Sequence, residues 1–118
     1  MKPWRGAAVA IAVFCTAPFA LAADYAPLDC TQAKTAAEET VCASYALGQA
    51  EARMATLYAT AASLVAMGQR GDIGDAQRQW LQRRDTCGRD VACLSRAYRN
   101  RIGQLNAVIA AIASRGPY

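Results

Sequence analysis

The most informative absence in this sequence is histidine, which does not occur among its 118 residues. Without histidine there can be no Ser-His-Asp or Cys-His catalytic arrangement, and the commonest general base near neutral pH is missing. The sequence also lacks a phosphate-binding glycine loop and a dinucleotide-binding fingerprint. Its few acidic residues occur at helix caps and on polar helix faces, where the helix dipole explains them better than glycoside hydrolysis does. We therefore predict that the protein is not an enzyme and needs no cofactor.

A large excess of either charge is also missing. The 13 Lys and Arg residues exceed the 9 Asp and Glu residues enough to give a net charge of +4. Lys2 and Arg5 belong to a segment that we expect to be removed, which lowers the net charge to +2. So small an excess attracts polyanions weakly. We expect no nucleic-acid partner and no strong attraction to a membrane surface.

The one long apolar stretch lies at the N-terminus, and it is too short to span a bilayer, which takes about 20 apolar residues. Lys2 and Arg5 precede it, and Ala20-Leu21-Ala22 ends it with small residues at the two positions that a signal peptidase reads. We predict a bacterial signal peptide at 1–22, cleaved between Ala22 and Ala23. Because bulky Phe14 precedes Cys15, a lipid-attachment site is not expected. The mature protein, 23–118, is predicted to be a single periplasmic or secreted domain without stable membrane insertion.

The mature chain has four cysteines, in two pairs with the spacings C-x11-C and C-x5-C. Zinc and redox sites usually contain C-x-x-C, so these spacings and the absence of histidine argue against a metal or redox site. Four cysteines allow three connectivities. A helical hairpin brings Cys87 and Cys93 together, which favours Cys87–Cys93 and leaves Cys30–Cys42. Each short bridge is expected to stabilise the fold by roughly 2–3 kcal/mol.

The rest of the chain shows helical periodicity and no strand alternation bounded by turns. Thr35 and Glu38 have the capping-box spacing, which predicts a short helix from Ala36 to about Cys42. Ser44 is a second N-cap, for a predicted helix at 45–67. Segment 68–74 holds three glycines in seven residues and is predicted to be a link that separates two helices.

Asp75 is then predicted to cap a third helix, which stops at Cys87-Gly88. The last helix is predicted at 90–114. Its inward apolar face is expected to include Val91, Leu94, Tyr98, Ile102, Leu105 and Ile112. The predicted fold is therefore all-α: a small antiparallel helical bundle of one short and three main helices, held by two local disulfides.

The densest polar segment is 78–85, Arg-Gln-Trp-Leu-Gln-Arg-Arg-Asp. We predict that Trp80, Arg84, Asp85 and Tyr98 are structural anchors, with Arg84 and Asp85 joining the third helix to the fourth. Three arginines are candidate partners for Asp85: Arg89, Arg99 and Arg101. The alternative is that this segment presents arginine and aromatic groups to a partner, since these residue types are enriched at binding hot spots.

Five segments together form a recognisable pattern. They are Asp29-Cys30, Glu38-x-x-Val41-Cys42-Ala43, Leu47-x6-Met54-x-x-Leu57-Tyr58, Gln77-Arg78-Gln79-Trp80-Leu81-x-x-Arg84-Asp85-x-Cys87, and Cys93-Leu94-x3-Tyr98-x-x-Arg101-Ile102-x-x-Leu105. This pattern resembles the N-terminal domain family of LprI-type lysozyme inhibitors, which are small exported bacterial helical domains. The resemblance covers nearly all of 23–118, and Gln-Arg-x-Trp-Leu and Arg-Asp-x-Cys are its most specific parts. It implies the same two local disulfides and a lysozyme as the partner.

An inhibitor could insert a loop that carries a hydrogen-bond donor between the two catalytic carboxylates of a lysozyme. Arg70 in the glycine-rich link and Arg89 between the last two cysteines are candidates for this contact. Arg83 is a third candidate partner-binding residue. Two other functions remain open: a periplasmic module that binds another envelope protein or peptidoglycan without inhibiting a lysozyme, and a purely structural or stress-related role. A net charge of +2 gives no long-range attraction to a basic lysozyme.

Overall fold

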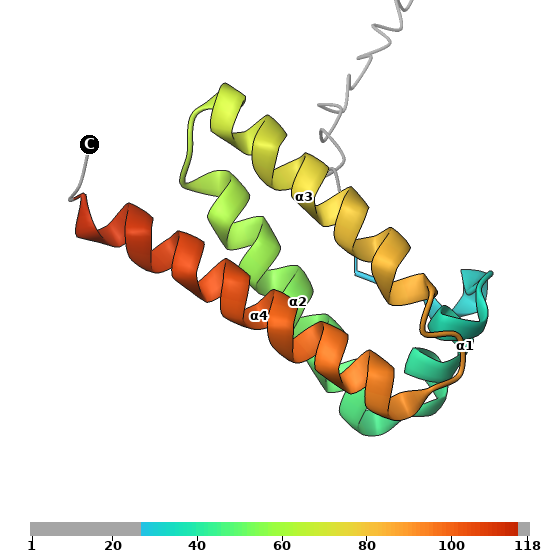
Figure 1. Cartoon of the computed structure of the whole chain (residues 1–118). Helices are drawn as coiled ribbons and strands as arrows, with labels where there is room; N and C mark the ends of the chain where they lie inside the picture. The colour runs from blue at the N-terminus through green and yellow to red at the C-terminus, as the bar shows by residue number, and fades with distance from the viewer. Residues whose placement is uncertain (1–26, 116–118) are drawn as a thin grey trace, which may run out of the picture.

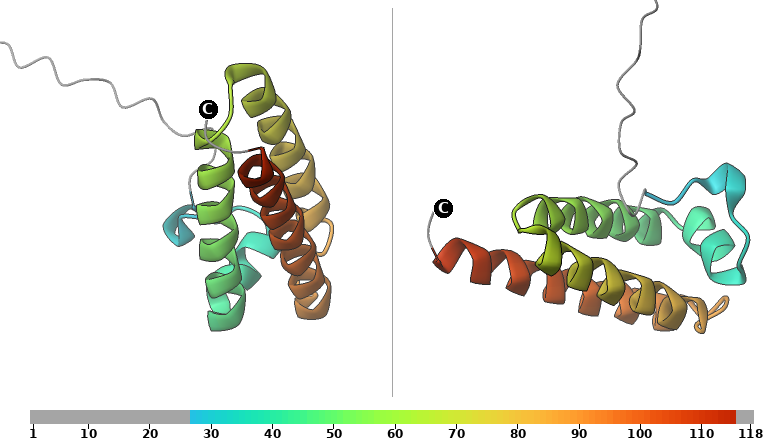
Figure 2. Two further views of the ribbon diagram at one scale, coloured as in Figure 1. Left: turned by 90° about the vertical axis from the view of Figure 1, so that its left-hand side faces the viewer. Right: turned by 90° about the horizontal axis from the view of Figure 1, so that it is seen from above.

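The computed structural model describes residues 27–115, and every regular element among them is a helix (Figure 1). A 3-10 turn, η1 (Cys30–Gln32), precedes the short helix α1 (Ala36–Ala43). Three long helices follow: α2 (Tyr45–Ser63), α3 (Met67–Asp85) and α4 (Val91–Ser114). They run in alternating directions, and α1 lies at the end of the bundle where α3 connects to α4 (Figure 2). The predicted all-α bundle is confirmed.

The predicted signal peptide at 1–22 lies outside the described residues. Within 27–115, no helix combines the length and the apolar composition that crossing a membrane requires.

Side-chain caps determine where three of the helices begin. Thr35 and Glu38 form a complete capping box at α1, because each side chain accepts from the other's backbone N–H. Ser44 accepts from the N–H of Leu47 at the start of α2. Asp90 caps α4 in the same way. Each such cap stabilises its helix by about 1 kcal/mol, so these starts follow from local sequence.

The predicted link at 68–74 is wrong, because this segment is helical. α2 ends at Ser63, the turn occupies 64–66, and α3 begins at Met67 and includes all three glycines. Asp75 is not a cap either, since it lies inside α3 and forms an ion pair with Arg78. Each glycine weakens a helix by about 1 kcal/mol relative to alanine, but packing can outweigh this preference.

Packing against α2 explains why the glycine-rich segment is helical. Ile73 is buried in the core, and a Cβ at Gly74 would lie in ordinary contact with the Tyr58 hydroxyl of α2, at 3.6 Å. Arg70, in the first turn of α3, closes the turn by donating to the backbone oxygens of Ala62 and Val65. Tertiary contacts therefore supply the stability that the local sequence lacks.

The core lies between the three long helices and extends to α1. It includes Trp80 on α3, whose ring meets that of Tyr98 on α4 edge to face at 5.1 Å. The Trp80 indole N–H donates to the backbone oxygen of Ala97, so its polar atom is satisfied although the ring is buried. The remaining core residues are Ala37, Val41, Leu47, Met54, Tyr58, Ala61, Val65, Ile73, Leu94, Leu105 and Ile112.

Both predicted disulfides are present. Cys30–Cys42 joins η1 to α1 across a Cα–Cα distance of 5.7 Å, and Cys87–Cys93 bridges the loop between α3 and α4 at 5.6 Å. Within that loop Gly88 has a φ of +56°, a left-handed conformation that side chains disfavour. The second bridge therefore holds α3 and α4 together at the end of the bundle that α1 also contacts.

Candidate functional site

A buried arginine connects all four helices. Arg84 on α3 is 2% exposed, and its Nη2 lies 2.7 Å from an Asp85 carboxylate oxygen. The carboxylates of Glu38 on α1 and Glu51 on α2 lie 3.5 and 3.9 Å from its guanidinium nitrogens. Its Nη1 also donates to the Tyr98 hydroxyl on α4, at 3.4 Å. Burial, the largest single influence, lowers the pKa of Arg84, but the interactions with Asp85 and Tyr98 together outweigh it and the net shift is upward.

Glu51 and Tyr98 complete this buried polar cluster. The Tyr98 hydroxyl donates to a Glu51 carboxylate oxygen at 2.6 Å, and the other Glu51 oxygen accepts from the Leu28 N–H at 3.2 Å. Burial and the negative charge of Glu51 raise the pKa of Tyr98, so the phenol stays protonated. Glu51 therefore accepts a hydrogen bond from the neutral Tyr98 hydroxyl and lies next to the positive charge of Arg84. The cluster joins the helices to one another, and its Glu38, Arg84 and Asp85 also line a surface pocket of about 430 Å³.

The predicted cross-hairpin pairing of Asp85 is wrong. Asp85 pairs with its neighbour Arg84 and accepts a long hydrogen bond of 3.5 Å from the Thr35 hydroxyl. At the end of α3 its carboxylate is directed to α1 and not to α4, so none of the three candidate arginines reaches it. Arg84 does reach α4, through Tyr98.

Two of the predicted partner-binding arginines are engaged within the molecule. Arg70 donates to the backbone oxygens of Ala62 and Val65, and it lies in a helix and not in a link between helices. Arg89, in the α3–α4 loop, pairs with Glu39 on α1 at 2.8 Å. Because both side chains of that pair are at least half exposed, it contributes at most about 1 kcal/mol. A partner could displace it at little cost.

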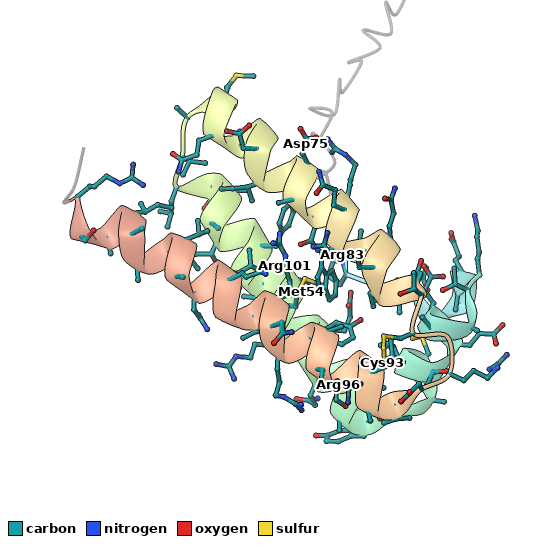
Figure 3. The ribbon with its side chains drawn as sticks, in the orientation of Figure 1. Met54, Asp75, Arg83, Cys93, Arg96 and Arg101 are labelled. Carbon is teal, nitrogen blue, oxygen red and sulfur yellow. A yellow bond between two sulfur atoms is a disulfide. The ribbon has the colours of Figure 1, made fainter. Side chains whose placement is uncertain are left out.

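The third predicted arginine, Arg83, lines a surface groove of about 310 Å³ between α3 and α4, which we call the α3–α4 groove. Its lining residues are Trp80, Arg83, Thr86, Cys87, Cys93, Arg96, Ala97, Asn100 and Gln104. Figure 3 labels Arg83 on α3 and Arg96 on α4, together with Cys93 near the loop. Neither Arg83 nor Arg96 forms an ion pair with any residue in 27–115.

Arg101, also labelled in Figure 3, is a buried arginine of the same region. Its Nε donates to the Gln77 side-chain oxygen at 2.9 Å, and its Nη1 donates to Gln104 at 3.2 Å. Its Nη2 is buried and has no hydrogen-bond partner among the described residues. Burial lowers the pKa of Arg101, and the positive charge of Arg83 lowers it further.

Sequence reasoning missed this second polar cluster. The predicted apolar face of the last helix passes through Val91 and Ile102, but Val91 is 51% exposed and Arg101 is 5% exposed. Gln77, which is 1% exposed, was not assigned a role either. A signal exists in the spacing, because Arg101 lies three residues after Tyr98 and four before Leu105, which places it on the same helical face.

Comparison with known proteins agrees with the resemblance seen in the sequence. A family model described as "Lysozyme inhibitor LprI" matches residues 30–115, a span that includes both disulfides and all the helices. Searches of curated proteins and of solved structures gave no match. Since the family model covers most of the chain, the protein belongs to the LprI lysozyme inhibitor family.

Proposed function

We propose that this protein is exported and that its mature domain inhibits a lysozyme by direct protein–protein contact. The observation that carries the proposal is the match of residues 30–115 to the LprI lysozyme inhibitor family. The signal-peptide pattern at 1–22 and two disulfides, which persist in oxidising compartments, support export to the periplasm or the medium. On this proposal the protein binds its target and performs no chemistry on it.

The architecture suits an inhibitor that binds without changing shape. Two disulfides and the four-helix contacts of Arg84 hold the end of the bundle around α1 in one arrangement. A preorganised surface loses little conformational entropy on binding, which favours affinity. Lysozymes carry two catalytic carboxylates, so arginine side chains on such a surface are suitable contacts.

A titration tests the proposal directly. Purified residues 23–118 are added to lysozymes of several structural types, and the lysis of bacterial cell walls is followed by turbidity. We expect lysis by at least one type to fall saturably as the protein is added. Unchanged lysis by every type at a large molar excess would remove the inhibitor function. An Arg89→Glu variant then locates the contact: lost inhibition with an unchanged melting temperature would place it at the Cys87–Cys93 loop.

The second candidate is an interaction module of the cell envelope without inhibitory activity. The observation that favours it is the net charge of about +2 after signal removal, which provides no attraction to a basic enzyme. Capture from an envelope extract distinguishes the two. If lysis is unaffected and one dominant envelope protein is captured by the immobilised domain, the module is the better description.

A further inference from the structure

The arginines of this domain differ in their surroundings. Arg78, Arg84 and Arg89 each have a carboxylate partner within the domain. Arg83 and Arg96 have no such partner among the described residues, although they line one groove from two different helices. Two unpaired guanidinium groups that converge on one concave surface form a local concentration of positive charge, which the small net charge of the whole chain conceals.

A third arginine, Arg101, lies behind this groove and is not part of its lining. It is 5% exposed, and its Nη2 has no hydrogen-bond partner in 27–115. Buried polar atoms in native proteins are nearly always paired, and an unpaired one needs an explanation. Its Nη1 donates to Gln104, which itself lines the groove, so Arg101 is linked by one hydrogen bond to the groove wall.

The electrostatics of the three arginines favour an anion. The charge of Arg83 is close enough to disfavour the charged form of Arg101, and the groove lining contains no acidic residue that would offset this repulsion. A bound carboxylate would relieve the repulsion and supply acceptors for donors that now face water.

We propose that the α3–α4 groove is the surface that binds carboxylate groups of the inhibited enzyme. This inference rests on the proposed function and names its contact surface. The planar fork of arginine matches a carboxylate in two parallel hydrogen bonds, and Asn100 and Gln104 add amide groups beside it. Trp80 and Ala97 provide an apolar wall, and arginine next to tryptophan is the composition of binding hot spots.

The groove is a better contact than the two arginines that sequence reasoning also selected. Arg70 would have to release the end of α2 to reach a partner, and Arg89 would have to release Glu39. Arg83 and Arg96 have no such competing partner, so their charge is available without rearrangement.

Tryptophan fluorescence provides a test that does not depend on inhibition. The sequence has two tryptophans, Trp4 and Trp80, and residues 23–118 contain only Trp80, which lines the groove. A blocked peptide with two adjacent glutamates is titrated at low salt, and inorganic phosphate is titrated separately. We expect saturable change in Trp80 emission with the peptide, lost in the Arg83→Gln/Arg96→Gln double variant. The matched control Arg53→Gln removes an exposed arginine on α2 and should bind as the wild type does.

The same variants are then compared in the lysis assay. We expect the double variant to inhibit at least tenfold more weakly than wild type, with its melting temperature unchanged because both side chains are exposed, and Arg53→Gln to inhibit fully. Undiminished inhibition by the double variant would overturn the groove as the contact surface while leaving the proposed function intact. If wild type inhibits no lysozyme, the proposed function is wrong. The peptide titration then decides by itself whether the groove binds carboxylates, and the absence of a saturable change in Trp80 emission would overturn that assignment. Binding of phosphate in preference to the peptide would overturn the carboxylate assignment.

Discussion

At the scale of single residues, Arg84 shows how a buried charge determines the relation of several helices. A guanidinium group can be buried only if carboxylates and other acceptors surround it, because an unpaired buried charge is strongly destabilising. Arg84 meets this condition with one group from each helix: Glu38, Glu51, Asp85 and Tyr98. The relative positions of the helices are thereby restricted more narrowly than apolar packing alone would require.

Replacing this residue should be costly. We expect Arg84→Met to lower the free energy of unfolding by about 3–5 kcal/mol, because Glu51 and Glu38 would lose their buried cation. Urea denaturation followed by circular dichroism measures the change. The control is Arg78→Met, since Arg78 pairs only with Asp75 at an exposed site and should change stability little. Similar urea midpoints for the two variants would contradict the structural role of Arg84.

Glu38 gives the domain a dependence on acid pH. The backbone N–H of Lys34 donates to it at 2.6 Å and lowers the pKa of its carboxyl below the ordinary value of 4.5, with smaller contributions from Thr35 and Arg84. A lowered pKa in the folded state means that the stabilisation is fully present above about pH 4.5 and is lost as the pH falls through the folded value. We expect the melting temperatures of wild type and Glu38→Gln to differ at pH 7 and to converge in acid. A difference that is constant with pH would contradict this role.

At the scale of elements, α3 is the helix whose existence depends most on its neighbours. Three glycines in its first half weaken it, and Ile73, Gln77, Trp80 and Arg84 fix it against α2 and α4. Its formation is therefore a consequence of burial and not of local preference.

The helical state of this segment can be tested at Gly71. A Cβ at Gly71 would meet no atom within 4 Å, and the residue is helical, so Gly71→Ala should raise the free energy of unfolding by about 0.4–1 kcal/mol. Thermal denaturation measures this. The contrasting variant is Gly88→Ala, which should be destabilising because Gly88 has a positive φ. A loss of stability in Gly71→Ala would indicate that the segment is not a regular helix.

At the scale of the whole molecule, the two disulfides act on the same end of the bundle. Each closes a short loop, with sequence separations of 12 and 6 residues, so each limits the unfolded chain only locally. A small domain buries a modest fraction of its surface, which makes even local bridges a considerable part of its stability.

Removing either bridge should lower stability without changing the fold. We expect Cys87→Ala/Cys93→Ala and Cys30→Ala/Cys42→Ala each to reduce the free energy of unfolding by roughly 2–3 kcal/mol. Denaturation in urea measures both, and peptide mapping of the unreduced wild type checks the pairing. Bridges that join the first pair to the second would contradict the architecture, and a loss of helical content in both variants would show that the bridges determine the fold.

The sequence by itself determined those features that neighbouring residues specify. The capping box of Thr35 and Glu38, the N-cap Ser44 and the two short cysteine pairs all act over a few residues, so they could be predicted correctly. Family membership could also be predicted, because it rests on short motifs that are read directly from the sequence and do not depend on how the helices pack.

Only the tertiary structure decided which polar groups are buried and which face solvent. The direction of Asp85, the burial of Arg101 and the convergence of Arg83 and Arg96 depend on how α3 and α4 are rotated about their axes. The helicity of 68–74 depends on contacts with α2. Rotation and contact are fixed by the packing of several helices at once, and no single segment of the sequence contains that information.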